Sequence, residues 1–268
     1  PSIRSVYGAT PRLQEALFIA VSQSGRSPDL VGLAEAARAG GALTLAVVND
    51  AASPLAERCE VVLPVHAGIE RSVAATKSWI GSAAALMHLL AHWADDPALR
   101  DAVRRLPDDL AAAARADWSP AVALLAGVEH LFVVGRGPGF PAAQEAALKL
   151  KETAGLHAEA YSAAELMHGP LTLAGPGFPV LALSQPDAAL PGMVDLVERL
   201  TARGVPLAVA GPAARPGCLP LPLAAGLHPF VAPVAAVQSF YLLAEAVARA
   251  RGRDPDRPPH LSKVTETL

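Results

Sequence analysis

The chain has 268 residues, about half of them hydrophobic, with a formal net charge of −3 and two cysteines, Cys59 and Cys218. This length accommodates one large domain or two of ordinary size. The weakly acidic charge argues against a nucleic-acid groove or an anionic membrane surface as a partner. Two distant cysteines provide neither a disulfide framework nor a metal site, and a reduced, cytoplasmic location fits them.

A loop rich in hydroxyl groups follows the first predicted strand. Residues 16–21 form an apolar run typical of a buried parallel strand, and residues 28–39 have apolar side chains at helical spacing. The intervening loop therefore lies at the carboxyl edge of a sheet, beside a helix N-terminus, and carries Ser22, Gln23, Ser24 and Ser27. Backbone N–H groups and the helix dipole attract an anion there, so the loop suits a phosphate. An ordinary serine-rich helix cap is the alternative that this loop alone leaves open.

The order of predicted elements repeats along the chain. In each half, a strand is followed by a helix, two further strands and a long apolar helix, and a Ser-Gln dipeptide closes the opening strand at Ser22 and again at Ser184. Short apolar strands that alternate with helices predict parallel βαβ units. We therefore expect an α/β protein of two tandem domains, each a doubly wound parallel sheet flanked by helices.

The two predicted domains differ where they begin. The second opens with a strand, a glycine-rich loop and a helix within residues 130–152. The first has no counterpart to this segment, so we expect the first domain to be incomplete at its N-terminus. The expected boundaries are 1–96 for the first domain, 97–120 for a linking helix, 121–250 for the second domain and 251–268 for a C-terminal tail.

A charged pair follows the glycine-rich turn of the second half. The turn "GRGPGF" lacks the glycine spacing of a dinucleotide site and the lysine of a P-loop, so a tight turn and a phosphate site both stay open. In the next helix, Lys149 and Glu152 are three residues apart and share a face, an arrangement also found in surface ion pairs.

Four titratable side chains come next, His157, Glu159, Glu165 and His168. Their spacing does not match that of a zinc-binding helix, and no cysteine pair accompanies them, so we expect no metal. His168 lies in a polar His-Gly-Pro turn, which suits a core histidine poorly and makes its imidazole a candidate acid–base group.

A stretch without charged residues, 216–244, requires a check for a membrane span. It contains several prolines together with His228 and Gln238, so it does not fit a single spanning helix. A strand, a loop and a buried helix from about Val234 fit it better, and we expect no contact with a membrane.

Four segments together resemble the sugar-isomerase (SIS) family. They are "SQSGRSPD", "ERSVAATK", "GRGPGFPAAQEAALKLKETAGLHAEAYSAAELMHGPL" and "DPDRPPHLSKVTETL", and they follow the family's order over nearly the whole chain. The chain looks most like the isomerase half of glucosamine-6-phosphate synthase and stand-alone glucosamine-6-phosphate deaminases of the SIS fold. The resemblance implies two SIS domains, a phosphosugar substrate and no cofactor.

The resemblance also assigns substrate-binding positions. The substrate phosphate would be held by Ser22, Gln23, Ser24 and Ser27, and the sugar would be lined by Val73, Ala75 and Ser262. Many relatives have serine where this chain has Ala75, which puts the sugar selectivity in doubt.

Catalytic positions carry over in the same way. Glu152 matches the base that moves a proton between C1 and C2 of the sugar, and Lys149 matches its charged neighbour. His168 matches the group that opens the sugar ring, and Lys263, in a tail that closes the active site, matches the amine near the sugar carbonyl. These residue types suit the chemistry, because proton transfer next to a carbonyl needs a carboxylate, and a nearby cation stabilises the enediolate.

The resemblance leaves the direction of the reaction open. In the synthase it implies an N-terminal glutaminase with a catalytic first cysteine, and nothing in this chain resembles that domain. We therefore expect a phosphosugar aldose–ketose isomerase that also deaminates an amino-sugar phosphate such as glucosamine 6-phosphate, releasing ammonia. The alternatives are an isomerase-domain fragment of a glutamine-dependent glucosamine-6-phosphate synthase and a non-catalytic sugar-phosphate-binding regulator. The presence of Glu152, His168 and Lys263 together argues against the regulator.

The two long apolar helices predict self-association. The segments "IGSAAALMHLLAHW" and "VAAVQSFYLLAEAVARA" carry more apolar surface than one side of a sheet needs, and exposing them would leave a large apolar patch. We expect a homodimer that buries them in a symmetric interface. The resemblance implies that His168 is contributed across this interface to the partner's active site.

Overall fold

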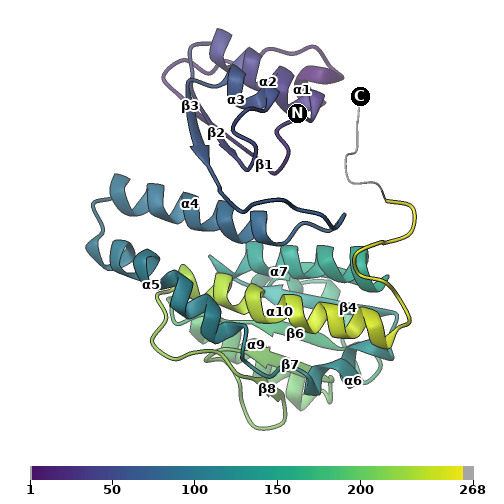
Figure 1. The fold of residues 1–268 in the computed structure, drawn as a ribbon. Helices are drawn as coiled ribbons and strands as arrows, with labels where there is room; N and C mark the ends of the chain where they lie inside the picture. The colour runs from purple at the N-terminus through teal and green to yellow at the C-terminus, as the bar shows by residue number, and fades with distance from the viewer. Residues whose placement is uncertain (1, 262–268) are drawn as a thin grey trace. The chain divides into compact units, whose positions relative to one another are not determined.

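The chain folds into two compact units, the first over residues 2–89 together with His260 and Leu261, and the second over Leu90–Pro259 (Figure 1). The computed structural model describes residues 2–261. Each unit is an α/β fold with a parallel sheet flanked by helices, so the predicted fold class is confirmed.

The first unit is built on a three-stranded parallel sheet of order β1-β2-β3. Its elements are α1 (Ser2–Ser5), β1 (Leu17–Ser22), α2 (Pro28–Ala39), β2 (Leu43–Val48), α3 (Pro54–Arg58), β3 (Val61–Pro64) and the start of α4 (Lys77–Trp93). Strand residues alternate between the two faces of a sheet, and the set containing Ala20 and Ala46 packs with Ala34 of α2 and Leu55 of α3. This packing places the carboxyl end of β1 beside the N-terminus of α2.

The second unit has a five-stranded parallel sheet of order β5-β4-β6-β7-β8. Its helices and turns are α5 (Pro97–Ala113), α6 (Pro120–Ala126), α7 (Gly139–Lys149), a π turn η1 (Leu150–Ala154), α8 (Ala163–Leu166), a short 3₁₀ turn η2 (Pro170–Thr172), α9 (Leu190–Ala202) and α10 (Val231–Ala250). Its strands are β4 (His130–Gly135), β5 (His157–Ser162), β6 (Val180–Leu183), β7 (Leu207–Ala210) and β8 (Leu219–Leu221).

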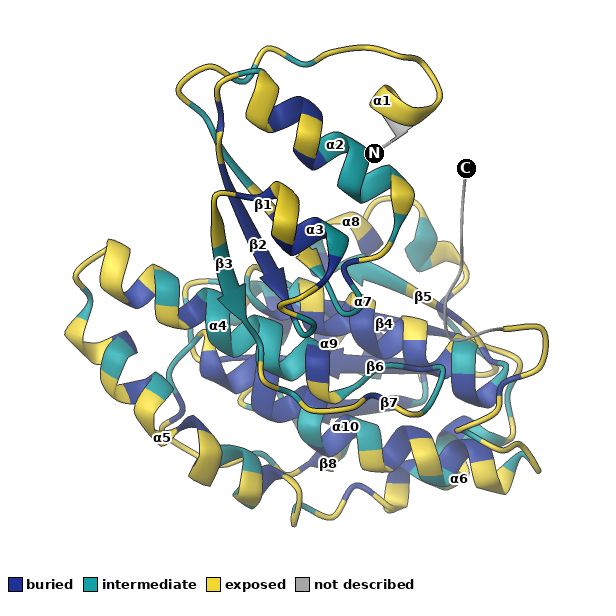
Figure 2. Cartoon of the chain, turned by 45° about the horizontal axis from the view of Figure 1, so that its top comes forward, coloured by how far each residue is buried: buried dark blue, intermediate teal, exposed yellow. Residues whose placement is uncertain are grey.

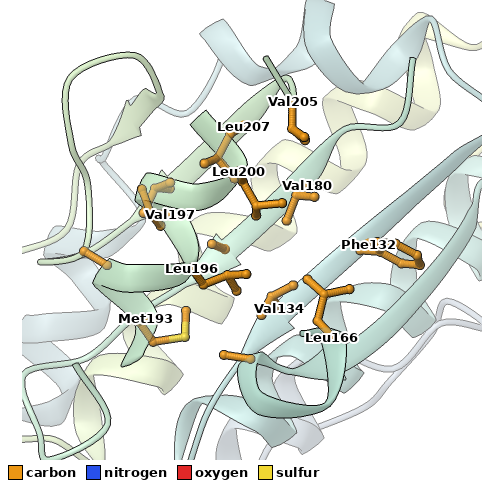
Figure 3. Packing of buried hydrophobic residues seen from close by; sticks show 14 of the residues in the cluster. Phe132, Val134, Leu166, Val180, Met193, Leu196, Val197, Leu200, Val205 and Leu207 are labelled. Atoms are coloured by element: carbon orange, nitrogen blue, oxygen red, sulfur yellow. The ribbon is translucent and has the colours of Figure 1, made fainter. Parts of the chain in front are cut away.

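Helices cover both faces of the second sheet. On one face, Phe132 of β4 and Val180 of β6 pack against Leu166 of α8 and against Leu196 and Leu200 of α9 (Figure 3). On the other face, α7 contacts β4 and β6, and α10 packs on α7. The central strands are consequently buried on both sides, which Figure 2 shows for β4, β6 and β7 and which explains their continuous apolar sequences.

The repeated order of elements predicted from the sequence is present in both units. The series β1-α2-β2-β3-α4 of the first unit corresponds to β6-α9-β7-β8-α10 of the second, with the short helix α3 as an addition. In the second unit, β4 and β5 lie beyond β6 and extend the sheet. In the described part of the first unit, β1 is a terminal strand of its sheet.

The charge-free stretch forms β8, a loop and α10, as predicted. The helix begins at Val231 rather than near Val234, since Pro233 sits within its first turn, where a missing N–H costs no hydrogen bond. By length and composition alone α10 could cross a membrane, but 72% of its most apolar stretch is buried inside the protein. It contacts α5, α6 and α7, so α10 is a core helix of the second unit. The expectation that this helix needs a symmetric interface to bury its apolar surface is therefore wrong, because most of it is buried within one chain.

Candidate active site

The loop between β1 and α2 presents hydroxyl groups at the N-terminus of a helix. Gly25 N donates to Ser22 Oγ at 3.0 Å and Arg26 N donates to Ser24 Oγ at 3.3 Å, so the loop folds back on its own serines. Gly25 has a φ of +63°, and a side chain there would collide with Ser53. Glycine is therefore required for this tight turn.

Ser27 occupies the N-cap position of α2 but makes no side-chain capping hydrogen bond. The helix-cap alternative raised by the sequence therefore does not account for this serine. Within residues 2–261, the side chains of Gln23 and Ser27 have no recorded hydrogen-bond partner, and both are half-buried. Arg26 is paired with Asp50 at 2.9 Å. The loop thus offers hydroxyl and amide donors to an anion at the positive end of a 12-residue helix.

A second loop of the first unit borders an open surface pocket of about 540 Å³, lined by Ile69, Glu70, Arg71, Ser72, Thr76 and Lys77. Glu70 is buried and organises this loop, because its Oε1 accepts hydrogen bonds from Thr76 N, Ser78 N and Ser78 Oγ at 2.7–3.1 Å. Burial by itself raises the pKa of Glu70, but the hydrogen bonds from Ser78 and Thr76 lower it overall. The predicted sugar-lining residues Val73 and Ala75 belong to this loop but do not line the pocket.

In the second unit, Lys149 and Glu152 form a short ion pair. Lys149 Nζ lies 2.6 Å from Glu152 Oε2 and 3.5 Å from Glu145 Oε1. The side chains of Lys149 and Glu145 are each 5% exposed, and that of Glu152 is 23% exposed. The arrangement is therefore not the solvated surface pair that the sequence left open, and the ammonium group is held between two carboxylates.

Glu145 is a further member of this group, contacted by Tyr241 of α10, whose hydroxyl donates to Glu145 Oε1 at 2.7 Å. Burial raises the pKa of Glu145, although Lys149 and Tyr241 both act to lower it. The sequence reasoning missed both residues. The i,i+4 spacing of Glu145 and Lys149 contained a signal, whereas Tyr241 is 96 residues away along the chain and had none.

Glu152 lies within the π turn that continues α7. Such turns insert one extra residue into a helix and occur often at functional sites. The turn is stabilised at both ends, since Thr153 Oγ1 donates to Lys149 O at 2.7 Å and Arg251 Nε donates to Ala154 O at 2.9 Å. It stops at Gly155, which has a φ of +62° and lies against the guanidinium of Arg253.

His168 is exposed in the loop between α8 and η2. Its backbone N donates to Glu165 O at 3.1 Å, but its ring has no hydrogen bond or ion pair to any residue that the structure describes. The ring is accordingly not part of the Lys149–Glu152 group within one described chain. Ser262 and Lys263 lie outside the described residues.

The remaining titratable candidates are placed apart from the Lys149–Glu152 group. His157 contacts His130, and Glu159 accepts a hydrogen bond from Tyr161 at 2.8 Å. Over the described part of the chain, no group of three or more histidine, cysteine, aspartate or glutamate side chains is arranged to hold a metal ion.

The second unit has its own strand-end loop after β6, with the same Ser-Gln pair. Ser184 Oγ donates to Ala210 O at 2.7 Å and accepts from Ala213 N at 3.0 Å. Gln185 Nε2 donates to Arg136 O and to Asp187 Oδ2 at 2.7 and 2.8 Å. Both side chains are buried. The Oε1 atom of Gln185 has no hydrogen-bond donor among residues 2–261 and lies where a side chain at Gly139 would be. This loop is filled by its own side chains.

Comparison with known proteins supplies the family. The model of the SIS domain matches residues 11–92 and 124–210. Glutamine–fructose-6-phosphate aminotransferase (isomerizing) of Symbiobacterium thermophilum is 38% identical over 268 aligned positions, which cover 93% of this chain and 44% of that protein. The chain thus spans less than half the length of the curated relatives it matches.

Solved structures agree with this match. A protein of Silicibacter pomeroyi DSS-3, provisionally named a phosphosugar isomerase, has a TM-score of 0.90 at 44% identity, with 96% of this chain and 78% of that chain covered. Glucosamine-6-phosphate deaminase of Thermotoga maritima has a TM-score of 0.78 at 21% identity, covering 100% and 81% of the two chains, and shows a shared fold.

Proposed function

Because the chain belongs to the SIS domain family, we propose that it is a phosphosugar aldose–ketose isomerase that deaminates an amino-sugar phosphate such as glucosamine 6-phosphate. The observation that carries this proposal is the short Lys149–Glu152 pair, in which the buried ammonium group lies between Glu145 and Glu152 and Glu152 belongs to a π turn. A non-catalytic regulator needs only a phosphate loop and has no use for a buried ammonium between two carboxylates.

The proposed chemistry begins with the open-chain aldose. Glu152 removes the proton from C2, electrons move toward the C1 oxygen, and the resulting enolate is stabilised by the Lys149 ammonium nearby. Return of the proton to C1, together with transfer of one N–H proton to the C1 oxygen, gives an imine at C2 and a hydroxyl group at C1. Water then adds to C2 and ammonia leaves, so that one amino-sugar phosphate and one water yield one ketose phosphate and one ammonia.

The remaining residues have supporting roles in this proposal. Ser22, Gln23, Ser24 and Ser27 bind the phosphate, and Val73, Ala75 and Ser262 contact the sugar. His168 opens the ring, and Lys263 approaches the carbonyl. The exposed ring of His168 supports its contribution to the active site of a second copy in a homodimer, and the two free cysteines are compatible with a reduced, cytoplasmic location.

Ammonia release from glucosamine 6-phosphate tests the proposal. The purified protein is incubated with this sugar, and ammonia is measured with glutamate dehydrogenase beside the Glu152→Gln variant. We expect ammonia and fructose 6-phosphate in equal amounts from the wild type only. Binding of the sugar phosphate without turnover would favour the regulator.

The isomerase part of a glutamine-dependent synthase is the second candidate, and the identity to curated aminotransferases favours it. Its activity would be interconversion of fructose 6-phosphate and glucose 6-phosphate without ammonia release from glucosamine 6-phosphate. Both reactions are therefore measured on the same preparation, and hexose-phosphate interconversion alone would replace the deaminase proposal by this one.

Subunit complementation tests the placement of His168. Inactive His168→Ala and inactive Glu152→Gln chains are mixed under conditions that exchange subunits. One hybrid site then contains an intact Glu152 and an intact His168, so activity should return. Mixed dimers that demonstrably form and stay inactive would place the whole site within one chain.

A further inference from the structure

Two histidines face each other at the beginning of neighbouring strands in the second unit. His130 opens β4 and His157 opens β5, and the register of the parallel pair places them directly opposite. Their Nδ1 atoms are 3.2 Å apart, although the residues are separated by 27 positions in the sequence. Both side chains are exposed, so an ion in solution has access to them.

The two rings are oriented rather than free. The rings of His130 and His157 meet edge to face, with centroids 5.4 Å apart, and His130 stacks on Phe178 at an interplanar angle of 13°. Phe178 in turn packs against Phe132 of β4 with centroids 4.4 Å apart. The backbone is held as well, since His157 N donates to Glu129 O at 3.0 Å.

We propose that His130 and His157 form a binding site for a transition-metal cation such as Zn²⁺, with both Nδ1 atoms as ligands. Tetrahedral Zn²⁺ bound to two imidazole nitrogens at about 2.0–2.1 Å requires those nitrogens to be about 3.3–3.4 Å apart. The observed separation meets this requirement with a movement of a few tenths of an ångström or less. Imidazole pairs select zinc, copper or nickel rather than Mg²⁺ or Ca²⁺, which prefer oxygen ligands.

Ion binding needs no change in the number of protons on the neutral pair. In the ion-free pair one Nδ1–H donates to the other Nδ1, which accepts through its lone pair. When a cation binds, that proton leaves Nδ1 and the same ring is protonated at Nε2, so both Nδ1 lone pairs face the ion. The exposed Nε2–H groups then donate to water.

The pair supplies two of the four ligands of tetrahedral Zn²⁺. Neighbouring carboxylates are engaged elsewhere, since Glu159 accepts from Tyr161 and Glu129 pairs with Arg251 at 3.2 Å. Among residues 2–261 no third protein ligand completes the set, so water or a small anion fills the remaining positions.

The pair lies on the sheet face shared with Phe132, whereas α7, which carries Lys149, packs on the opposite face. The proposal is therefore independent of the proposed catalytic function.

A bound ion would connect β5, the terminal strand of this sheet, to β4. Because the cation binds the folded register and not the unfolded chain, it should raise the melting temperature, and the rise should grow with the logarithm of the free cation concentration above Kd. This gives the site a readout that does not depend on enzyme activity.

Zinc titration of the metal-free protein tests the proposal. Isothermal calorimetry with ZnCl₂ is performed on wild type, His130→Gln, His157→Gln and, as a matched control, His66→Gln, which alters another exposed histidine. We expect one Zn²⁺ per chain in wild type and control, and affinity weaker by about tenfold or more in each variant of the pair. Equal affinity in all four proteins, or no binding by wild type, would overturn the proposal.

A second measurement on the wild type removes the dependence on folded variants. Nitrogen-15 NMR of the histidine rings reports which nitrogen binds the ion. We expect Zn²⁺ to shift the Nδ1 resonances of two histidines and the zinc-induced rise in melting temperature to be absent with MgCl₂. A shift of Nε2 resonances only would contradict the geometry.

Discussion

The two units end an equivalent strand with the same Ser-Gln dipeptide and use it differently. After β1, Ser22 and Gln23 lie in a half-buried loop in which Gln23 has no recorded partner among the described residues. After β6, Ser184 and Gln185 are buried and bonded to neighbouring backbone and to Asp187. Among the described residues, the same dipeptide thus leaves a glutamine amide without a partner at one strand end and closes the other strand end with internal hydrogen bonds.

The comparison teaches that residue identity at a strand end does not by itself make a binding site. The two loops differ in whether neighbouring protein groups already accept the hydrogen bonds that their side-chain donors can make. In the second unit, the glycines within residues 135–139 allow the backbone to come close to Gln185. The Nε2 atom of Gln185 donates a hydrogen bond to Arg136 O in this backbone segment. The residues of the second unit to which we assign the proposed chemistry lie elsewhere, in the Lys149–Glu152 pair at the end of α7.

The largest expected effect is on kcat, and it comes from a change in the Lys149–Glu152 pair of the second unit. Glu152→Gln keeps the shape of the side chain and removes its basicity, so kcat should fall by about a hundredfold or more with little change in KM. Steady-state ammonia release measures both constants. A variant with near-normal kcat would show that Glu152 is not the base.

The second-largest expected effect is on the free energy of unfolding, and it differs between the two Ser-Gln loops. Ser184→Ala removes the acceptor of the buried Ala213 N–H and should lower the free energy of unfolding by about 1–3 kcal/mol. Ser22→Ala, the matched change in the first loop, removes the acceptor of the Gly25 N–H, which is only partly buried, and should lower it by a smaller amount of about 0.5–1 kcal/mol. Urea unfolding followed by circular dichroism provides both values. Equal losses would remove the distinction between an open and a closed loop.

The same open loop should be sensitive in binding. Ser22→Ala and Ser24→Ala should each raise the KM for glucosamine 6-phosphate by about tenfold, because each removes a hydroxyl donor to the phosphate. Ser184→Ala is the matched control and should leave KM unchanged. Weak binding of unphosphorylated glucosamine, measured by calorimetry, should be the same in all three variants; a parallel loss for both ligands contradicts the phosphate role.

The smallest effect is a difference in pH dependence between two buried carboxylates. The lowered pKa of Glu70 stabilises the first unit above the ordinary glutamate pKa, and this contribution disappears as pH falls through the lowered value. The raised pKa of Glu145 acts oppositely, because its contribution is complete below the ordinary value and is lost as pH rises through the raised one.

Substitution of each glutamate by glutamine tests whether the two carboxylates make stability depend on pH in opposite directions. Glu70→Gln should make the free energy of unfolding less dependent on pH in the acid range. Glu145→Gln should make it less dependent on pH above about pH 4.5. Urea unfolding across this range, with wild type as the reference, gives the slopes. The opposite assignment of the two slopes would refute the stated environments.

The sequence predicted those features that depend on local periodicity. Apolar runs identified the strands, and the repeat of Ser-Gln after β1 and β6 identified the tandem architecture. The shared face of Lys149 and Glu152 followed from their spacing, but their burial did not, because the spacing of a solvated pair is the same. The π turn has no simple periodicity of its own.

Contacts between distant segments were beyond the sequence. Tyr241 reaches Glu145 from a helix 96 residues away, and His130 meets His157 only because β4 and β5 are paired in one register. Each local pattern was compatible with several partners, and the sheet order selects among them.

The position of α10 has a consequence for how the second unit folds. Ser239 Oγ donates to Ala113 O across 126 residues, and Arg251 Nη1 donates to Ala126 O across 125. Contacts of such large sequence separation close slowly, because the loop entropy must be lost before they contribute. During synthesis the segment that carries Lys149 is complete long before Tyr241 and Arg251 emerge from the ribosome. A nascent chain that stops before Val231 should therefore expose the apolar sides of α5 and α7, and the burial of Lys149 and Glu145 should be among the last events of folding.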